Sequence, residues 1–478
     1  MQNQNWSFLS KVIVVAAVTV LVVSFSTFVA AQNERTPEQP GAEQAPAPYQ
    51  APPAATVRAQ GTVITPASSV ARPEDAGLRA HTNLLLFAPA GREMSSISPE
   101  NTYAEYPASL ACVYKVGPAY AGCVPAGGSG HASGGWGAIA LVDAYDDPNA
   151  FSDLVYFSTF FGLTKPTAKT FIKVYANSSF GSLGGLTASC SGTPPGNTSW
   201  GLEESLDIEW AHAMAPAAKI ILVEACSNSY NDLLYAEAVA GIKVSSYGGG
   251  DISNSWASGE FSGEVGTTDD FFYRYYWKNI TYFASAGDAG WGAAYPSSSP
   301  WVISAGGTTV NRDANGNFLS ESCWSGSGGG VSAYELWQSP PNILNGMGPW
   351  TNFQYELAGQ GARQTPDMSF DADPASGVWV YDTYGGGAWY VVGGTSVSSP
   401  ALAGIVNASN NRFGQAPPGG GYYLAHENDY TYSQLYAFTA YKTNFYDVTT
   451  GSNGTGHNAG TGYDQCTGIG SPRGKLGK

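Results

Sequence analysis

An apolar run, a turn of small residues and a second apolar run together constrain the fold of this chain most strongly. Residues 389–392 have the composition of a buried strand, and residues 401–408 have that of a helix. The turn Gly-Gly-Thr-Ser-Val-Ser-Ser-Pro at 393–400 therefore places Ser396 at a strand-to-helix junction. Unpaired backbone N–H groups and the helix dipole stabilise a developing oxyanion there. Ser396 is a candidate nucleophile, although a turn that only caps an ordinary helix would contain the same residues.

Strand-like and helix-like segments alternate through the rest of the chain. This alternation predicts an α/β fold with a mainly parallel central sheet and helices on both faces. About 400 residues from Leu78 onward are enough for one large domain of this class. The expected strands are 137–143, 170–175, 218–224, 251–255, 280–285, 301–305 and 388–393, and the expected helices are 149–162, 202–214, 231–243, 265–278 and 397–409.

Three acidic residues are candidate partners for the serine. Glu203 and Asp207 are four residues apart in an expected helix, so both carboxylates lie on one face. If that face is buried, repulsion between like charges raises one pKa of the pair. Asp288 follows an apolar run and lies at the carboxyl end of an expected strand, where open α/β sheets place their sites. A solvated helix face and a common Asx turn would explain the same residues without any chemistry.

Aspartates mark two further positions. Asp143 is the last residue of the expected strand 137–143. A solvated aspartate at the end of a core strand is the simpler interpretation of this residue. Near the end of the chain, Asp447 and Asp464 flank a Gly-rich stretch. Carboxylate and backbone carbonyl oxygens are the ligands that calcium prefers, so this stretch is a candidate calcium site. An ordered surface loop without a metal is the simpler interpretation.

Taken together, these segments resemble the sedolisins, serine-carboxyl peptidases that look like subtilisins rebuilt for acid. The resemblance covers about residues 107–472. It includes Gly-Thr-Ser396 followed by Pro400, the Glu203-x-x-x-Asp207 pair, and Ser-Ala-Gly-Asp288. It implies a subtilisin-like fold with a C-terminal calcium-binding loop.

The resemblance also implies roles for single residues. Ser396 would be the nucleophile, Glu203 the general base with Asp207 behind it, and Asp288 a donor to the oxyanion. Asp143 stands where some members carry a glutamate, and Trp256 resembles a tryptophan near that carboxylate chain. Asp143 is one methylene shorter, so its reach toward Asp207 is shorter. One structural Ca²⁺ would be held by Asp447, by the carbonyls of Val448, Gly460 and Gly462, and by Asp464.

Charge and composition exclude some classes of function. The net charge is −16, only 12% of the 478 residues are charged, and no basic patch is available for nucleic acid. Few lysines and a low surface charge suit an acidic medium. We therefore expect a secreted, monomeric endopeptidase that acts on proteins or peptides in acid, without a nucleic-acid partner.

The N-terminal part of the chain predicts export. Lys11 precedes an apolar run at 12–29 that ends in small residues, so residues 1–31 are expected to be a signal peptide. An uncleaved membrane anchor and a periplasmic location are the alternatives, because about 18 apolar residues is the lower limit for a spanning helix. About 75 residues then precede the catalytic domain, fewer than the 100 or so of an ordinary domain, so the large folded pro-domain usual in the family is not expected. The expected divisions after the signal peptide are a Pro/Ala-rich disordered linker (32–77), an N-terminal extension or short pro-segment (78–106) and the peptidase domain (107–478).

The six cysteines favour disulfides over a metal site, because none forms a Cys-x-x-Cys spacing. Cys112–Cys123 is the natural local pair. Cys190–Cys226 and Cys323–Cys466 then complete one of several possible connectivities.

Two other functions fit parts of the sequence. A subtilisin-type triad would use Asp143, His212 and Ser396. His212, however, follows Glu203 by nine residues in one helix, so the two side chains point in roughly opposite directions. A non-catalytic binding module on the same fold is the other alternative, and the presence of all four candidate catalytic residues argues against it.

Overall fold

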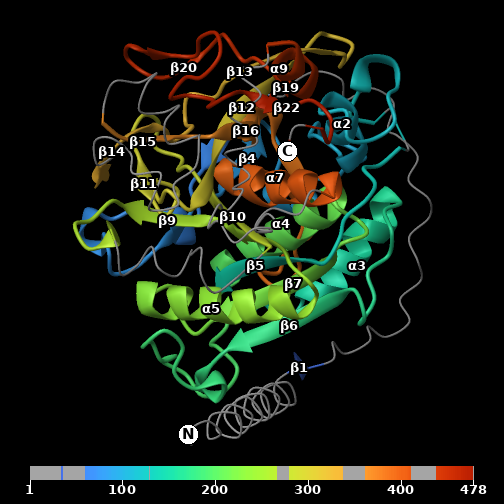
Figure 1. Ribbon diagram of the computed structural model, residues 1–478. Coiled ribbons are helices and arrows are strands. Elements are labelled where there is room, and N and C mark those ends of the chain that lie inside the picture. The colour runs from blue at the N-terminus through green and yellow to red at the C-terminus, as the bar shows by residue number, and fades with distance from the viewer. Residues whose placement is uncertain are drawn as a thin grey trace, which may run out of the picture.

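A central sheet covered by helices on both faces forms the body of the molecule (Figure 1). The expected signal peptide, and the expected helix 265–278 apart from its first residue, lie outside the part that the structure describes. None of the described helices is long and apolar enough to cross a membrane. The computed structural model describes residues 60–126, 128, 130–265, 279–336, 361–410, 438–476 and 478, and the short strand β1 (Glu34–Arg35).

The strands at the centre of the sheet run parallel, as the alternation of strands and helices predicts. β16 (Met368–Asp371) pairs parallel with the strand β12 (Val302–Arg312), and β13 (Phe318–Cys323) pairs antiparallel with β12 at the edge of the sheet. The parallel strands lie in the order β6 (Phe171–Ala176), β7 (Lys219–Ala225), β5 (Ala138–Ala144), β8 (Gly250–Asn254), β10 (Ile280–Ser285) and β12.

Successive side chains of the central strands enter opposite core layers, because strand side chains alternate between faces. In β5, Ile139 and Leu141 belong to one cluster of buried residues, whereas Ala140 and Val142 belong to another. The first cluster packs against α3 (Ala150–Phe161), α4 (Thr198–Met214) and α7 (Thr395–Ser409), and the second packs against α5 (Tyr230–Ser246). Both faces of the sheet are therefore dry, and the predicted fold class is confirmed.

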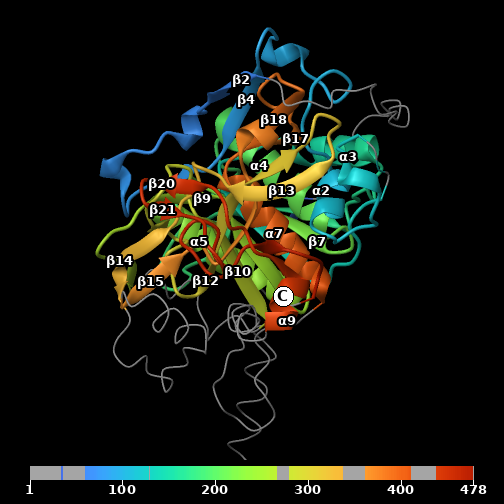
Figure 2. The same cartoon turned by 90° about the horizontal axis from the view of Figure 1, so that it is seen from above.

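The strand that precedes Ser396 is present but pairs differently from the central strands. β18 (Trp389–Gly393) pairs antiparallel with β17 (Val378–Tyr381) and with β4 (Leu85–Pro89), and β4 pairs with β2 (Gly61–Ile64) (Figure 2). A short Gly-rich connection between β17 and β18 favours a hairpin over a parallel crossover.

β2 also corrects the expected boundary of the disordered linker. Residues 60–77, assigned to that linker from composition, contain β2 and two short 3-10 helices, η1 (Ala67–Ser69) and η2 (Pro73–Asp75). All four residues of β2 are exposed, so the strand is held by its backbone ladder to β4 and not by burial of its own side chains. The low apolar content of residues 60–77 therefore wrongly predicted that they are disordered.

The remaining elements are short and surround the sheet. They are β3 (His81–Thr82), η3 (Met94–Ser96), α2 (Pro107–Val113), η4 (Ala121–Cys123), η5 (Ser178–Phe180), β9 (Trp256–Gly259), β11 (Ala294–Tyr295), β14 (Gly330–Leu336), β15 (Ala362–Thr365), η9 (Pro374–Ser376), α9 (Phe438–Asn444), β19 (Phe445–Tyr446), β20 (Ser452–Gly454), β21 (His457–Asn458) and β22 (Ser471–Pro472).

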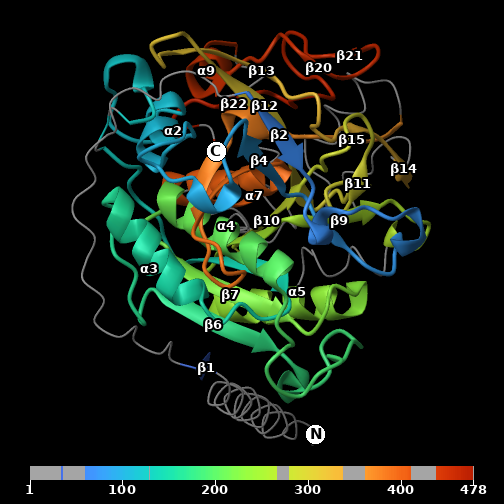
Figure 3. The same cartoon turned by 180° about the vertical axis from the view of Figure 1, so that it is seen from behind.

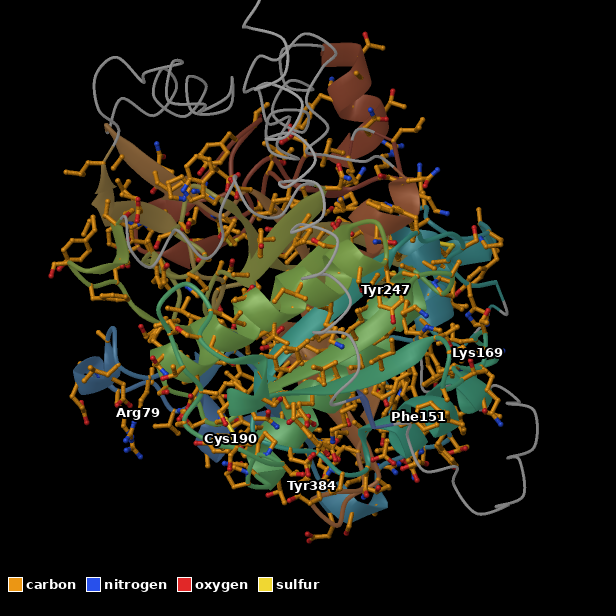
Figure 4. All side chains as sticks on the ribbon, turned by 60° about the horizontal axis from the view of Figure 1, so that its bottom comes forward. Arg79, Phe151, Lys169, Cys190, Tyr247 and Tyr384 are labelled. Atoms are coloured by element: carbon orange, nitrogen blue, oxygen red, sulfur yellow. A yellow bond between two sulfur atoms is a disulfide. The ribbon has the colours of Figure 1, made fainter. Side chains whose placement is uncertain are left out.

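All six cysteines are paired, in the connectivity suggested by the sequence. Cys112 bonds Cys123, and Cys323 bonds Cys466. Cys190 bonds Cys226 and so links the loop before α4 to the end of β7 (Figure 4). In the same view Tyr384, from the β17–β18 connection, also lies at the lower edge of the molecule.

Candidate active site

Ser396 is the second residue of α7 and is fully buried. Its hydroxyl oxygen donates to the Ser255 carbonyl (3.2 Å) and accepts from the Asn83 backbone N–H (3.1 Å). Pro400 lies inside the same helix and lacks the N–H that would bond to the Ser396 carbonyl. The Ser255 hydroxyl lies 3.3 Å from that carbonyl and 2.7 Å from Asp207 Oδ1, so its single proton is shared between the two acceptors.

Gly394 supplies the sharp turn that delivers Ser396. It caps α7 at φ 97°, a conformation that side chains with a Cβ rarely adopt. A Cβ at this position would lie less than 3.0 Å from both the Asn83 carbonyl oxygen and Asp288 Oδ2. Those two oxygens therefore converge on the Gly394 Cα, two residues before the candidate nucleophile.

α4 brings Glu203 and Asp207 to the serine. The two helices approach closely because Gly404 of α7 faces α4, where an added Cβ would meet Met214 Cβ at 2.7 Å. Glu203 and Asp207 are both fully buried. Burial first, then the charge of Asp143, raises the pKa of Glu203 well above its usual range, while the hydroxyls of Ser396 and Thr82 act in the opposite direction.

Asp143 completes a chain of three carboxyls. Burial raises the pKa of Asp143 to about 8, and both of its oxygens are buried without a hydrogen-bond partner among the described residues. Burial and then the charges of Asp143 and Glu203 raise the pKa of Asp207, whose Oδ1 accepts from the Ser255 hydroxyl at 2.7 Å. Trp256 Nε1 donates to the Val142 carbonyl (2.9 Å), next to Asp143 in β5. Despite its shorter side chain, Asp143 is thus close enough to perturb the pair electrostatically.

Asp288 follows β10 and contacts the residue before the serine. Its Oδ1 accepts from the Thr395 backbone N–H (2.7 Å) and the Thr395 hydroxyl (2.9 Å). Its Oδ2 is buried and has no hydrogen-bond partner among the described residues. Burial raises the pKa of Asp288 to about 7, so below neutral pH this oxygen carries a proton that it can donate.

His212 lies elsewhere on α4. Its Nε2 is 2.7 Å from the Thr164 carbonyl oxygen, beyond the end of α3, and burial lowers its pKa. The ring therefore packs as a buried, hydrogen-bonded residue away from the serine, as the nine-residue spacing from Glu203 predicts. This geometry leaves a triad of Asp143, His212 and Ser396 without support.

The candidate calcium ligands lie in one loop region between β19 and β22. Asp447 Oδ1 accepts from the Gly462 N–H (2.9 Å), and Asp464 Oδ2 accepts from the Gly460 N–H (2.9 Å). Val448 is buried beside them. No cluster of three or more His, Cys, Asp or Glu side chains suited to a metal occurs among the described residues.

Four polar residues around the serine were assigned no role from the sequence. Asn83, Ser255, Ser285 and Thr395 all bond to site residues or to one another. Three of them come from segments far from Ser396 in the chain, and two lie within motifs, Ser285 in Ser-Ala-Gly-Asp288 and Thr395 in Gly-Thr-Ser396. Ser285 also follows an apolar run directly, whereas nothing local singled out Asn83 or Ser255.

A solved protein supports this fold. The structure of Pseudomonas sedolisin, described as a serine-carboxyl proteinase complexed with two molecules of pseudo-iodotyrostatin, matches with a TM-score of 0.56. The match is 22% identical and covers 77% of this chain and 95% of that chain. No family model matches the chain.

Sequence relatives lead to the same group. Kumamolisin from Bacillus sp. (strain MN-32) is 30% identical over 326 residues, which is 61% of this chain and 52% of kumamolisin. Sedolisin from Pseudomonas sp. (strain 101) is 28% identical over 253 residues, which is 46% of this chain and 38% of that protein. The chain is thus similar in sequence and in fold to members of the sedolisin family. This sedolisin homologue spans about half the length of kumamolisin and less of the other relatives, which include xanthomonalisin from Xanthomonas sp. (strain T-22), 28% identical over 268 residues and matched over 27% of its length.

Proposed function

We propose that this sedolisin homologue is an exported serine-carboxyl endopeptidase that hydrolyses proteins or peptides in acid. The observation that carries the proposal is one buried site in which a serine hydroxyl lies beside a carboxyl with a raised pKa. Carboxyl groups that share protons work as acids and bases only while the medium keeps some of them protonated.

In the proposed mechanism Ser396 Oγ attacks the scissile carbonyl and Glu203 takes the hydroxyl proton. Burial raises the pKa values of Glu203, Asp207 and Asp143 alike, and neither Glu203 nor Asp143 has a hydrogen-bond partner among the described residues. The mechanism requires that the shared protons reside on Asp207 and Asp143 at the moment when Glu203 accepts the serine proton. Glu203 later returns the proton to the leaving amine, and a water molecule hydrolyses the acyl ester by the same steps.

The oxyanion formed in this attack needs donors. The Ser396 backbone N–H is one, and protonated Asp288 Oδ2 is the other. The pKa of Asp288 is about 7, so the donor is present below that pH and is lost as the pH rises through it. Above neutral pH a negative carboxylate would face the negative oxyanion, and the rate should fall.

Replacing the nucleophile tests the proposal. Ser396→Ala should lower hydrolysis of a denatured protein at pH 4 by a factor on the order of 10⁶, and Glu203→Gln should cause a loss of similar order. The assay is a pH series on the wild type and both variants. Ser398→Ala is the matched control, because Ser398 is buried in the same helix but donates to the Phe370 carbonyl.

Two results would contradict this mechanism. One is full activity at mildly alkaline pH. The other is activity that survives Glu203→Gln but is lost in His212→Gln, which would favour the histidine triad. Complete inactivity of correctly folded wild type towards every substrate would favour a binding module.

We also propose a structural Ca²⁺ held by Asp447 and Asp464 with the carbonyls of Val448, Gly460 and Gly462. The set fits calcium because it offers only hard oxygen ligands on a loop that already gathers both aspartates. Such an ion would stabilise the fold and takes no part in the proton transfers described above. At 100 times its dissociation constant it would contribute about 2.7 kcal/mol.

Chelation of calcium should therefore lower the melting temperature by roughly 5 °C, and added Ca²⁺ but not Mg²⁺ should restore it. The measurement is thermal unfolding with and without chelator. Asp447→Asn should reproduce the lower value in calcium and show no further fall in chelator. An unchanged melting temperature in chelator would remove the calcium assignment.

A further inference from the structure

Residues 382–388 connect β17 to β18 and are attached to the beginning of α3. Asp153 of α3 accepts hydrogen bonds from the Thr383 backbone N–H (2.7 Å) and from the Thr383 hydroxyl (2.9 Å). Asn149, the residue before α3, donates from Nδ2 to the same hydroxyl (2.9 Å). One threonine of the connection is therefore held by a carboxyl group and by an amide group at the start of the neighbouring helix.

Tyr384 of the same connection lies against the beginning of α4. A Cβ on Gly196 or on Gly201 would lie less than 3.0 Å from the Tyr384 side chain, so glycine at both positions permits this close approach. Figure 3 shows α3 and α4 side by side, which lets one connection touch the beginnings of both helices. Gly201 precedes Glu203 by two residues in α4. The connection therefore packs against the turn that carries the proposed general base.

Aromatic packing fixes the two ends of the connection. Tyr381 pairs with Trp389 where β17 and β18 separate. Tyr381 also stacks on Tyr156 of α3 with 4.1 Å between the ring centroids, and the Trp389 ring lies 4.7 Å from that of Phe160. Between these ends, residues 385–387 are all glycine, which leaves the backbone many conformations. The connection can therefore move about a fixed base.

A set of carboxyl groups with one lysine faces this connection. The lysine is Lys173 of β6, which lies 2.6 Å from Asp146 and 2.7 Å from Glu224. The other carboxyl groups of the set have no ion pair among the described residues. The set consists of Asp146 and Asp147 after β5, Asp153 of α3, Glu204 and Glu209 of α4, Glu224 of β7, and Asp382 of the connection itself. Burial raises the pKa of the tyrosines beside the set, so they stay neutral: Tyr175, Tyr384 and Tyr390.

Protons stabilise the closed position of this connection. Burial raises the pKa of Asp147 and of Asp153 to about 7 and that of Asp382 to about 6, and the charge of Asp382 adds to the rise in the other two. Burial also raises the pKa of Glu209, whose Oε2 accepts from the Tyr381 N–H (3.1 Å). With the connection moved into water, Asp382 and the groups that it covers would titrate near 4. The stabilisation by protons is therefore complete below about pH 4 and is lost as the pH rises through 6 to 7.

We propose that residues 382–388 form a pH-sensitive clasp that is closed on α3 and α4 in acid and opens at neutral pH while the central sheet stays folded. Ionisation places several negative charges in one small, poorly solvated region, where they repel one another. Opening removes Tyr384 from the start of α4, so Glu203 loses part of the packing that fixes its helix. The clasp lies outside the carboxyl groups of the candidate active site, and its opening does not require the proposed function.

Hydrogen exchange of the full chain, followed by mass spectrometry from pH 5 to pH 8, tests the clasp. Protection of residues 382–388, corrected for the intrinsic exchange rates, should fall at least about 100-fold over this range. At pH 8, β5 should remain at least about 100-fold better protected than the clasp, because the opening is local. Replacing Asp153 and Asp382 together by asparagine should reduce the fall at least about tenfold, since the amides keep acceptors for the same N–H groups but cannot ionise. Asp313→Asn, on the surface, is the matched control and should leave the fall unchanged.

A steric variant tests the contact with α4 independently. Gly201→Ala should open the clasp already at pH 5, because its methyl group would displace the Tyr384 ring, and β5 should be unaffected. Unchanged exchange of the clasp in Gly201→Ala would contradict that contact. Equal loss of protection in the clasp and in β5, or an equal fall in the asparagine variant and in Asp313→Asn, would overturn the inference. Low protection of the asparagine variant at pH 5 would also overturn it. None of these measurements uses hydrolysis, so each outcome leaves the proposed function untouched.

Discussion

Raising the pH from about 4 to about 8 should lower the melting temperature of this protein by at least about 10 °C. The reason is a large set of buried carboxyl groups whose pKa values are raised mainly by burial. Burial raises the pKa of Asp143, Glu224 and Asp251 to about 8, and that of Asp147 and Asp153 to about 7. In the unfolded chain these groups titrate near 4.

The sign follows from proton binding. Between about pH 4 and pH 8 the folded state holds protons that the unfolded state has lost, so unfolding releases protons and becomes easier as the pH rises. The stabilisation is fully present below the unfolded pKa values and disappears as the pH passes the folded ones. This protein should therefore be most stable in acid, where many proteins begin to unfold.

Scanning calorimetry across a pH series at constant ionic strength measures this effect. Asp251→Asn should reduce the decrease in melting temperature between pH 4 and pH 8, because the amide cannot ionise. Its oxygen still accepts the hydrogen bond from Asn407 Nδ2, which lies 2.7 Å from Asp251 Oδ2. Asp313→Asn is the control, since Asp313 lies on the surface, where hydrogen bonds from Asn317 lower its pKa. A melting temperature that rises from pH 4 to pH 8 would contradict the buried-carboxyl argument.

Gly394→Ala should lower kcat/KM for an external peptide by at least about 10³-fold while the protein still folds. The new methyl group would occupy the point where the Asn83 carbonyl oxygen and Asp288 Oδ2 converge, so it would displace the oxyanion from its donors. The left-handed backbone adds strain of about 1–3 kcal/mol, which should appear as a lower melting temperature.

Gly386→Ala separates the two effects. Gly386 lies in the β17–β18 connection at φ +77°, and an added Cβ there meets nothing within 4 Å. This control carries the backbone strain without the steric block, so its activity should stay within a few-fold of wild type. Activity equal to wild type in Gly394→Ala would show that no substrate carbonyl binds at this point.

The sequence predicted elements and motifs better than it predicted their partners. Ser396, Glu203, Asp207 and Asp288 each sit in a local pattern of small or acidic residues beside an apolar run, so short-range signals were enough to select them. Asn83 and Ser285 contact each other across 202 residues of chain, and no local pattern reports such a contact. β18 illustrates the same limit, because its apolar run predicted a strand but not the pairing with β4.

Burial of charge was the other property that the sequence hid. Glu204, Glu224 and Glu237 are 0% exposed, although acidic residues at such positions are typical of solvated surfaces. Lys173 partly compensates Glu224 at 2.7 Å, but Glu237 has both oxygens without a hydrogen-bond partner among the described residues. Only packing in three dimensions, combined with protonation in acid, makes these sites tolerable.

The covalent attachment of β3 to β4 determines the effective concentration of β3 at the candidate active site. A segment that belongs to the same chain reaches the site at an effective concentration set by the connecting residues and not by the amount of protein in solution. Diluting the protein therefore cannot release this segment. A substrate at micromolar concentration competes with a segment whose effective concentration is millimolar or above.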